Sequence, residues 1–163
     1  MEVSGRKWKS FVEIMLLTGT FQRSLDDKRR FALPKKIRDV FDNTVYITPG
    51  TDASLWLYPA SVFTKLADQL SHAPPTGQDV RTFQRLFFAQ AECQEMDAQA
   101  RVRIPASLAS LAKLSKEVVL LGVRDHLEIW DRQLWDAYLA EQQPRYDSVA
   151  ERVLGMAPPI APA

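Results

Sequence analysis

The residues best suited to chemistry are basic side chains that follow an aspartate in a short polar segment. Six of them come within twelve positions of Asp26: Lys28, Arg29, Arg30, Lys35, Lys36 and Arg38. Lysine and arginine neutralise phosphate groups, and a two-stranded ribbon fits the major groove of DNA. The segment therefore indicates a contact with double-stranded DNA. The alternative is a solvated surface loop, because runs of charge usually face solvent.

An aspartate with an arginine four residues later occurs twice, as Asp26 with Arg30 and as Asp97 with Arg101. Across a tight turn the carboxylate can hold the guanidinium in place. An exposed pair of this kind stabilises a turn by about 0.2–1 kcal/mol. We expect this structural role for Asp97 and Arg101. For Asp26 we expect that the aspartate also orients a turn whose basic residues contact phosphates or base edges.

Basic charge is unequal between the two segments. Residues 17–40 contain seven basic and three acidic side chains, a net charge of +4. The matching window, residues 88–111, contains only Arg101 and Arg103 against three acidic residues, a net charge of −1. The first segment is therefore the stronger candidate for DNA binding, with Arg101 and Arg103 as weaker candidates.

Sequence patterns of catalysis and of cofactor binding are missing. The six glycines are never close together, so there is no glycine-rich phosphate loop, and no Gly-x-Ser-x-Gly elbow occurs. Cys93 lies in an expected strand with no histidine near it in the sequence, and we expect it to be buried and inert. The sequence predicts a protein that is not an enzyme and that uses no cofactor and no small-molecule substrate.

The composition argues against a metal site and a membrane span. One cysteine and two distant histidines, His72 and His126, offer no set of metal ligands at a usual spacing. No apolar stretch approaches the roughly 20 residues that cross a bilayer. The 21 basic and 20 acidic residues give a formal net charge of +1, so any basic surface must be local. We expect a cytoplasmic protein without a membrane partner.

The chain contains two copies of one sequence unit. Residues 21–34 match residues 92–105 at an offset of 71, and residues 55–58 match residues 127–130 at an offset of 72. Two copies are too few for a solenoid. Because one copy is smaller than most domains that fold alone, we expect a pseudo-twofold pair with one joint core.

Each copy predicts the same order of elements. A strand, a polar turn and a second strand form a hairpin signature. Proline then opens a short helical turn, a second hairpin follows, and an amphipathic helix closes the copy. The expected first hairpins pair residues 20–25 with 30–33 and residues 91–96 with 101–104. Further helices are expected at about 78–89 and 146–154.

Four stretches resemble the MraZ family of bacterial transcriptional regulators. They are Met15–Pro34 (MLLTGTFQRSLDDKRRFALP), Ala91–Pro105 (AECQEMDAQARVRIP), Lys116–Gly122 (KEVVLLG) and Leu127–Asp131 (LEIWD). The resemblance implies an α+β fold, a tandem AbrB-like swapped-hairpin β-barrel with short flanking helices. It also implies nucleoid association, binding to short DNA repeats upstream of the division and cell-wall gene cluster, and assembly of subunits into a homo-oligomeric ring.

The resemblance divides the chain into five segments. These are an N-terminal extension (1–14), a first AbrB-like repeat (18–62), a helical linker (63–89), a second repeat (90–133), and a C-terminal helix with a disordered tail (134–163). The family's Asp-x-Lys-Gly-Arg turn falls on Asp26, Lys28 and Arg30. Its glycine is replaced by Arg29 here and by Ala100 in the second copy. If this position requires a positive φ, each replacement costs roughly 1 kcal/mol.

Two other functions fit the same resemblance. AbrB-like hairpins also occur in antitoxins, where an appended segment masks a toxin, and the chain after Pro144 could serve that role through Tyr146, Val149 and Val153. A ring scaffold is the third interpretation. DNA binding that weakens steeply with salt would separate a DNA-binding regulator from both.

Overall fold

The structure is a computed structural model that describes residues 16–159, so the expected extension at 1–14 and the end of the tail at 160–163 lie outside the described residues. The chain divides into two units, one ending at Arg132 and the other beginning at Gln133. The strands are β1 (Thr20–Ser24), β2 (Arg30–Ala32), β3 (Thr44–Pro49), β4 (Leu55–Pro59), β5 (Glu92–Glu95), β6 (Arg101–Arg103), β7 (Glu117–Val123) and β8 (His126–Asp131). The helices are α2 (Arg38–Phe41), α3 (Ala60–Ser71), α4 (Gln78–Phe88), α5 (Ala106–Leu111), α6 (Arg132–Gln142) and α7 (Tyr146–Met156), with a 3-10 turn, η1 (Gln143–Arg145), before α7.

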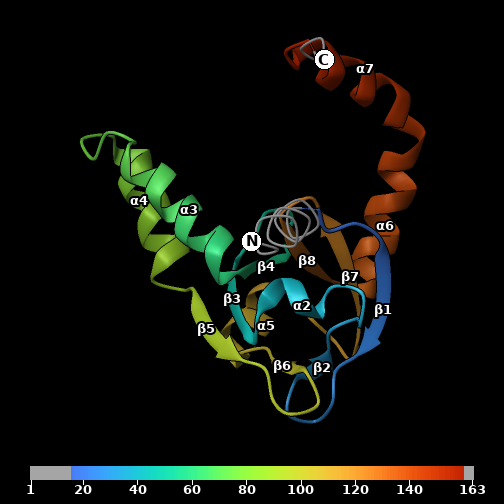
Figure 1. Ribbon diagram of the computed structural model, residues 1–163. Helices are drawn as coiled ribbons and strands as arrows, with labels where there is room; N and C mark the ends of the chain where they lie inside the picture. Colours follow the sequence, from blue (N-terminus) through green and yellow to red (C-terminus); the bar gives the residue numbers. More distant parts are fainter. Residues whose placement is uncertain (1–15, 160–163) are drawn as a thin grey trace, which may run out of the picture. The chain divides into compact units, whose positions relative to one another are not determined.

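Several strands pair across the two copies, and two hairpins form within a copy (Figure 1). The expected second hairpins, β3 with β4 and β7 with β8, are confirmed. The expected first hairpins are wrong beyond their turns, because β1 pairs with β7, β2 with β6, and β5 with β3. The pairing of β2 with β6 places Phe31 opposite Val102, and both side chains are fully buried there. Burial of large apolar side chains is worth about 1.5–3 kcal/mol each, which favours the exchanged pairing.

The six-stranded sheet is open within residues 16–159, and the expected closed β-barrel is wrong. Its strand order is β1-β7-β8-β4-β3-β5, so β1 and β5 are edge strands. The strands β2 and β6 form a separate two-stranded sheet. Each has only three residues, and they pair only with each other, so they do not join the two edges. The fold is α+β with antiparallel sheets, as expected.

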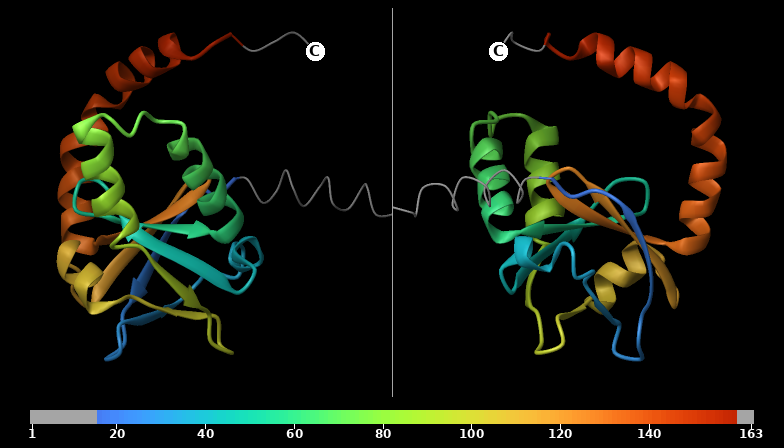
Figure 2. Two further views of the ribbon diagram at one scale, coloured as in Figure 1. Left: turned by 90° about the vertical axis from the view of Figure 1, so that its left-hand side faces the viewer. Right: turned by 45° about the vertical axis from the view of Figure 1, so that its right-hand side comes forward.

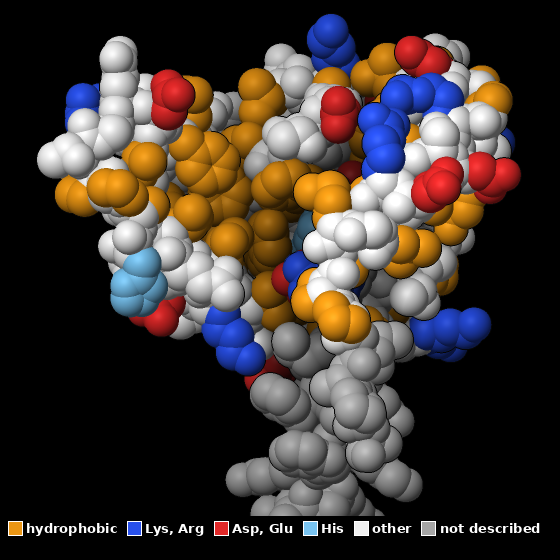
Figure 3. Space-filling view, turned by 90° about the horizontal axis from the view of Figure 1, so that it is seen from above, with side chains coloured by type: hydrophobic (Ala, Val, Ile, Leu, Met, Phe, Trp, Pro, Cys, Tyr) orange, Lys and Arg blue, Asp and Glu red, His pale blue; other side chains and the backbone are white. Residues whose placement is uncertain are grey.

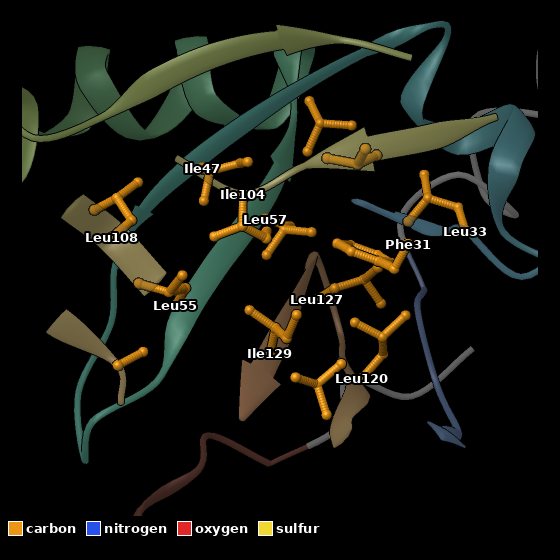
Figure 4. Packing of buried hydrophobic residues seen from close by; sticks show 14 of the residues in the cluster. Phe31, Leu33, Ile47, Leu55, Leu57, Ile104, Leu108, Leu120, Leu127 and Ile129 are labelled. Carbon is orange, nitrogen blue, oxygen red and sulfur yellow. The ribbon is translucent and has the colours of Figure 1, made fainter. Parts of the chain in front are cut away.

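The two copies share one hydrophobic core, which confirms the expected joint core (Figure 4). Phe31 and Leu33 from the first copy pack with Ile104 and Leu108 from the second. Leu57 and Ile129 come from paired central strands and are also completely buried. Neither copy contains a complete set of these contacts, so we expect the two copies to fold as one cooperative unit.

The helices α3 and α4 form a hairpin that covers one side of the first unit (Figure 1). Their apolar faces meet Tyr58 and Trp56 of β4 in a second cluster. Phe87 is buried there, and its ring stacks on Phe83 at 5.2 Å. The amphipathic helices expected after the first copy and before the second are therefore confirmed.

The second unit consists of α6, η1 and α7. Pro144 lies in the 3-10 turn between the two helices, where a proline without an N–H does not interrupt an α-helix. The helix expected at about 146–154 is confirmed and extends to Met156. Trp135 and Tyr138 of α6 stack at 5.7 Å.

His126 occupies a half-buried site on β8 between two carboxylates. Its Nδ1 lies 2.8 Å from Asp125 and its Nε2 lies 3.4 Å from Glu128, whose other oxygen accepts a hydrogen bond from Trp130 Nε1. Burial lowers the pKa of His126, but the hydrogen bonds and negative charges of Glu128 and Asp125 outweigh burial, so the pKa is raised.

This raised pKa makes the stability of the fold depend on pH. The protonated ring stabilises the folded state below the unfolded pKa of about 6.5, and that contribution is lost as the pH rises through the folded pKa. We expect the free energy of unfolding to fall as the pH is raised above about 6.5, measured by urea denaturation at each pH. The variant His126→Gln should flatten this dependence, whereas His72→Gln, at an exposed position, should preserve it. An unchanged slope in His126→Gln would contradict the assignment.

Candidate nucleic-acid interface

Two equivalent turns are built around Asp26 and Asp97. In the first, one oxygen of Asp26 accepts hydrogen bonds from the backbone N–H groups of Lys28 (2.9 Å) and Arg30 (2.8 Å). Its other oxygen accepts a bond from Arg30 Nε at 2.8 Å. Asp97 repeats this arrangement with the backbones of Gln99 and Arg101 and with Arg101 Nε at 2.7 Å. The expected contact between aspartate and arginine is confirmed in both turns.

The hydrogen bonds keep both aspartates ionised. The backbone N–H of Arg30 contributes most to holding the pKa of Asp26 below its ordinary value, and the backbone N–H of Arg101 does the same for Asp97. A carboxylate with several donors favours its charged form. Both turns therefore keep their ion pairs at neutral pH, and neither aspartate is suited to act as an acid.

The two turns lie side by side at the same end of the first unit (Figures 1 and 2). Their backbones are joined by two symmetric hydrogen bonds, from Leu33 N to Ala100 O at 3.1 Å and from Ile104 N to Arg29 O at 2.9 Å. Arg101 also reaches across, with Nη1 at 3.9 Å from Asp26 Oδ2. The two turns thus form one connected structure to which both copies contribute.

The positions of the missing turn glycines adopt the left-handed conformation. Arg29 has a φ of 59° and Ala100 a φ of 57°. A left-handed residue with a Cβ is strained by roughly 1–2 kcal/mol. In this conformation the carbonyl oxygens of Arg29 and Ala100 accept the two hydrogen bonds from the other copy. The strained backbone therefore accompanies the contact between the turns.

Relief of this strain should stabilise the protein. We expect Ala100→Gly to raise the free energy of unfolding by about 0.5–1 kcal/mol, because the relief exceeds the added flexibility of the unfolded chain. Chemical denaturation measures the change. Ala98→Gly is the control, since Ala98 lies in the same turn without a positive φ and its replacement should destabilise. Equal destabilisation by both variants would contradict the conformational argument.

The structure separates the predicted basic residues into exposed and anchored groups. Lys28, Lys35, Lys36 and Arg103 are exposed. The other four, Arg29, Arg30, Arg38 and Arg101, are half-buried. Arg29 Nε donates a hydrogen bond to Ile104 O at 3.0 Å, and Arg38 Nε donates one to Leu33 O at 2.9 Å. The anchored arginines hold the backbone near the turns, and the exposed lysines keep their charges in solvent.

Residues from both copies meet in a groove of about 300 Å³ beside the turns. Arg29 and Arg103 line it together with Glu92 and Gln94. Sequence reasoning did not single out Arg23, which donates from Nε to Ala32 O at 3.0 Å and thereby ties β1 to β2. Arg23 lies among the basic residues of the window 17–40, and its charge was the feature of the sequence that could have indicated it as part of the site.

The remaining candidates for chemistry give a mixed outcome. Cys93 is exposed, so the expectation that it is buried is wrong: it lies on the edge strand β5, most of whose side chains face solvent. Among residues 16–159 no group of three potential metal ligands occurs. No helix in the same range is long and apolar enough to cross a membrane.

Comparison with known proteins connects this geometry to one family. Residues 16–86 and 87–156 each match the family described as "MraZ protein, putative antitoxin-like". The chain is 40% identical over 139 residues to the transcriptional regulator MraZ of Salinispora arenicola, covering 85% of this chain and 98% of the relative. It is 39% identical over 128 residues to that of Finegoldia magna, covering 78% and 90% of the two chains. It is also 39% identical over 136 residues to that of Lactiplantibacillus plantarum, covering 83% and 96%.

These matches cover both copies of the repeat and most of the described chain. The two matched stretches correspond to the two copies that the offsets of 71 and 72 indicate. The relatives are named as regulators of transcription and not as enzymes, in agreement with the expectation from the sequence. With two repeats matched in order and relatives aligned over nearly their full length, the chain belongs to the MraZ family.

Proposed function

We propose that this chain is a transcriptional regulator that binds double-stranded DNA through its paired turns. The observation that carries the proposal is the difference between two turns of equal construction. The first exposes Lys28 where the second has the neutral Gln99, and the following helical segment exposes Lys35 and Lys36 where the second copy has alanine and serine. The names of the relatives support the regulatory role.

The family resemblance refines the proposal. The exchanged pairing of strands between the copies supports an AbrB-like swapped-hairpin arrangement. The operator consists of short repeats upstream of the protein's own division and cell-wall gene cluster, and the protein acts on the nucleoid in the cytoplasm. Several copies associate in a homo-oligomeric ring, so that several turns contact successive repeats. Such linked binding raises affinity by roughly 10²–10⁴.

A salt series of gel shifts tests this function. The probe is the DNA upstream of the protein's own gene, and the control is a scrambled duplex of the same length and composition. We expect specific binding whose logarithm falls linearly with the logarithm of salt concentration, with a slope of about −0.9 for each phosphate contact. Equal affinity for both duplexes, or no binding at low salt, would contradict the proposal.

The second candidate function is protein binding of the antitoxin or ring-scaffold kind. The family description contains the term antitoxin-like, and α7 exposes Tyr146 and Val153 to solvent. A protein of this class would associate with a protein partner and leave the DNA probe unshifted, so the same salt series distinguishes the two.

A further inference from the structure

An apolar groove of about 520 Å³ lies between α4 and the turn that joins β3 to β4. Trp56 and the buried Phe87 line it, together with side chains that are largely exposed: Phe83 (45%), Leu86 (57%) and Leu111 (47%). No lining residue is charged. Figure 3 shows hydrophobic side chains gathered on the side of the first unit that carries the α3–α4 hairpin. An exposed apolar surface of this kind is typical of a binding site.

The helix α7 carries an exposed apolar stripe of matching character. Tyr146, Val149, Val153 and Met156 are spaced at i, i+3, i+7 and i+10, which places them on one helical face. Their exposed fractions are 64%, 36%, 57% and 83%. A stripe with this spacing is the pattern by which an amphipathic helix lies in an apolar groove.

The charges that border the two surfaces are opposite. Asp52 lies in the turn between two residues that line the groove, and Asp79 lies one helical turn before Phe83. Arg145, the last residue of η1, lies one helical turn before Val149, and Arg152 of α7 lies one turn after it. The ion pairs found among residues 16–159 include none of these four side chains. Acidic groups therefore border the groove, and basic groups border the stripe.

We propose that α7 of one copy docks in the α4 groove of a second copy. This inference rests on the self-association proposed above and names its contact. Each surface carries exposed apolar side chains, and in the proposed contact the groove of one copy and the stripe of another cover each other. Because the two surfaces differ, the contact is head-to-tail, and a contact of that kind closes into a ring when the rotation between neighbours allows it. The pairs Asp52 or Asp79 with Arg145 or Arg152 fix the direction of the helix in the groove.

Two variants of the full chain test the contact by light scattering at micromolar concentration. Leu86→Glu places a charge in the groove and Val153→Glu places one in the stripe; both side chains are exposed, so the fold is retained. We expect the unmodified protein to be oligomeric and each variant to be a single copy. The controls Arg85→Glu and Ser148→Glu, on the other faces of the same helices, should remain oligomeric.

Mixing the two variants tests the direction of the contact. Leu86→Glu retains an intact α7 and Val153→Glu retains an intact groove, so an equimolar mixture should form a species of two copies. A mixture that stays at one copy overturns the head-to-tail contact. Oligomers that persist in both variants overturn the docking of α7 and leave the proposed ring standing, whereas an unmodified protein that is always a single copy overturns both.

Discussion

Replacement of Lys28 and Arg30 by alanine is expected to reduce DNA affinity by on the order of 10²–10³ at ordinary salt, while the oligomer stays intact. Each turn loses two cations, and each lost phosphate contact lowers the salt slope by about 0.9. The loss is multiplied when several turns bind one DNA molecule. Gel shifts over a salt series measure the affinity and the slope, and light scattering measures the oligomer.

The second turn provides a matched control for this variant. Arg30 also binds Asp26, so its removal weakens a turn as well as removing a charge. The double variant Gln99→Ala with Arg101→Ala breaks the equivalent ion pair between Arg101 and Asp97, whose atoms are 2.7 Å apart. It removes one cation, Arg101, because residue 99 is a neutral glutamine. We expect the control to lower stability and to retain most DNA binding. If both double variants bind DNA equally well with unchanged slopes, the first turn is not the DNA-binding surface.

Separation of the two copies is expected to abolish cooperative folding of the first. A fragment of residues 16–86 keeps β1 and β2 but loses their partners β7 and β6. The side chain of Phe31 then loses its packing partner Val102 and is exposed to solvent. We expect the fragment to show no cooperative thermal transition as a monomer by circular dichroism.

Addition of the second copy should reverse this loss. Mixing the fragment with residues 87–132 supplies β6 and β7, and a single cooperative transition is expected to return. A soluble monomer of residues 16–86 that melts cooperatively would contradict the joint core as the folding unit.

The turns were predictable from the sequence because their interactions are local. The carboxylates of Asp26 and Asp97 bind backbone groups two and four residues away, so spacing along the chain is nearly the whole of the geometry. The short helices after Pro34 and Pro105 and the hairpin of α3 and α4 follow from similarly local patterns. Because the turn and the proline occur again at an offset of 71 residues, each of these local patterns could be recognised twice in the sequence.

The pairing of the strands was not predictable in the same way. Alternation identifies a strand and its buried face, but two copies of one strand pattern satisfy alternation equally well within a copy or across copies. The burial of Phe31 against Val102, which is visible only in the folded structure, favours pairing across the copies. The exposure of Cys93 has the same origin, since only the strand order reveals that β5 lies at an edge.

The exchanged strands also set the order of events during synthesis. The partner of Thr20 in the sheet is Leu121, so β1 is complete long before β7 exists. At about 5–20 residues per second, the intervening roughly 100 residues keep β1 waiting for on the order of 5–20 s. Throughout that time Phe21 and Phe31 are outside a finished core. The nascent chain therefore exposes an apolar segment of the first copy until the second copy has emerged, because the core closes only then.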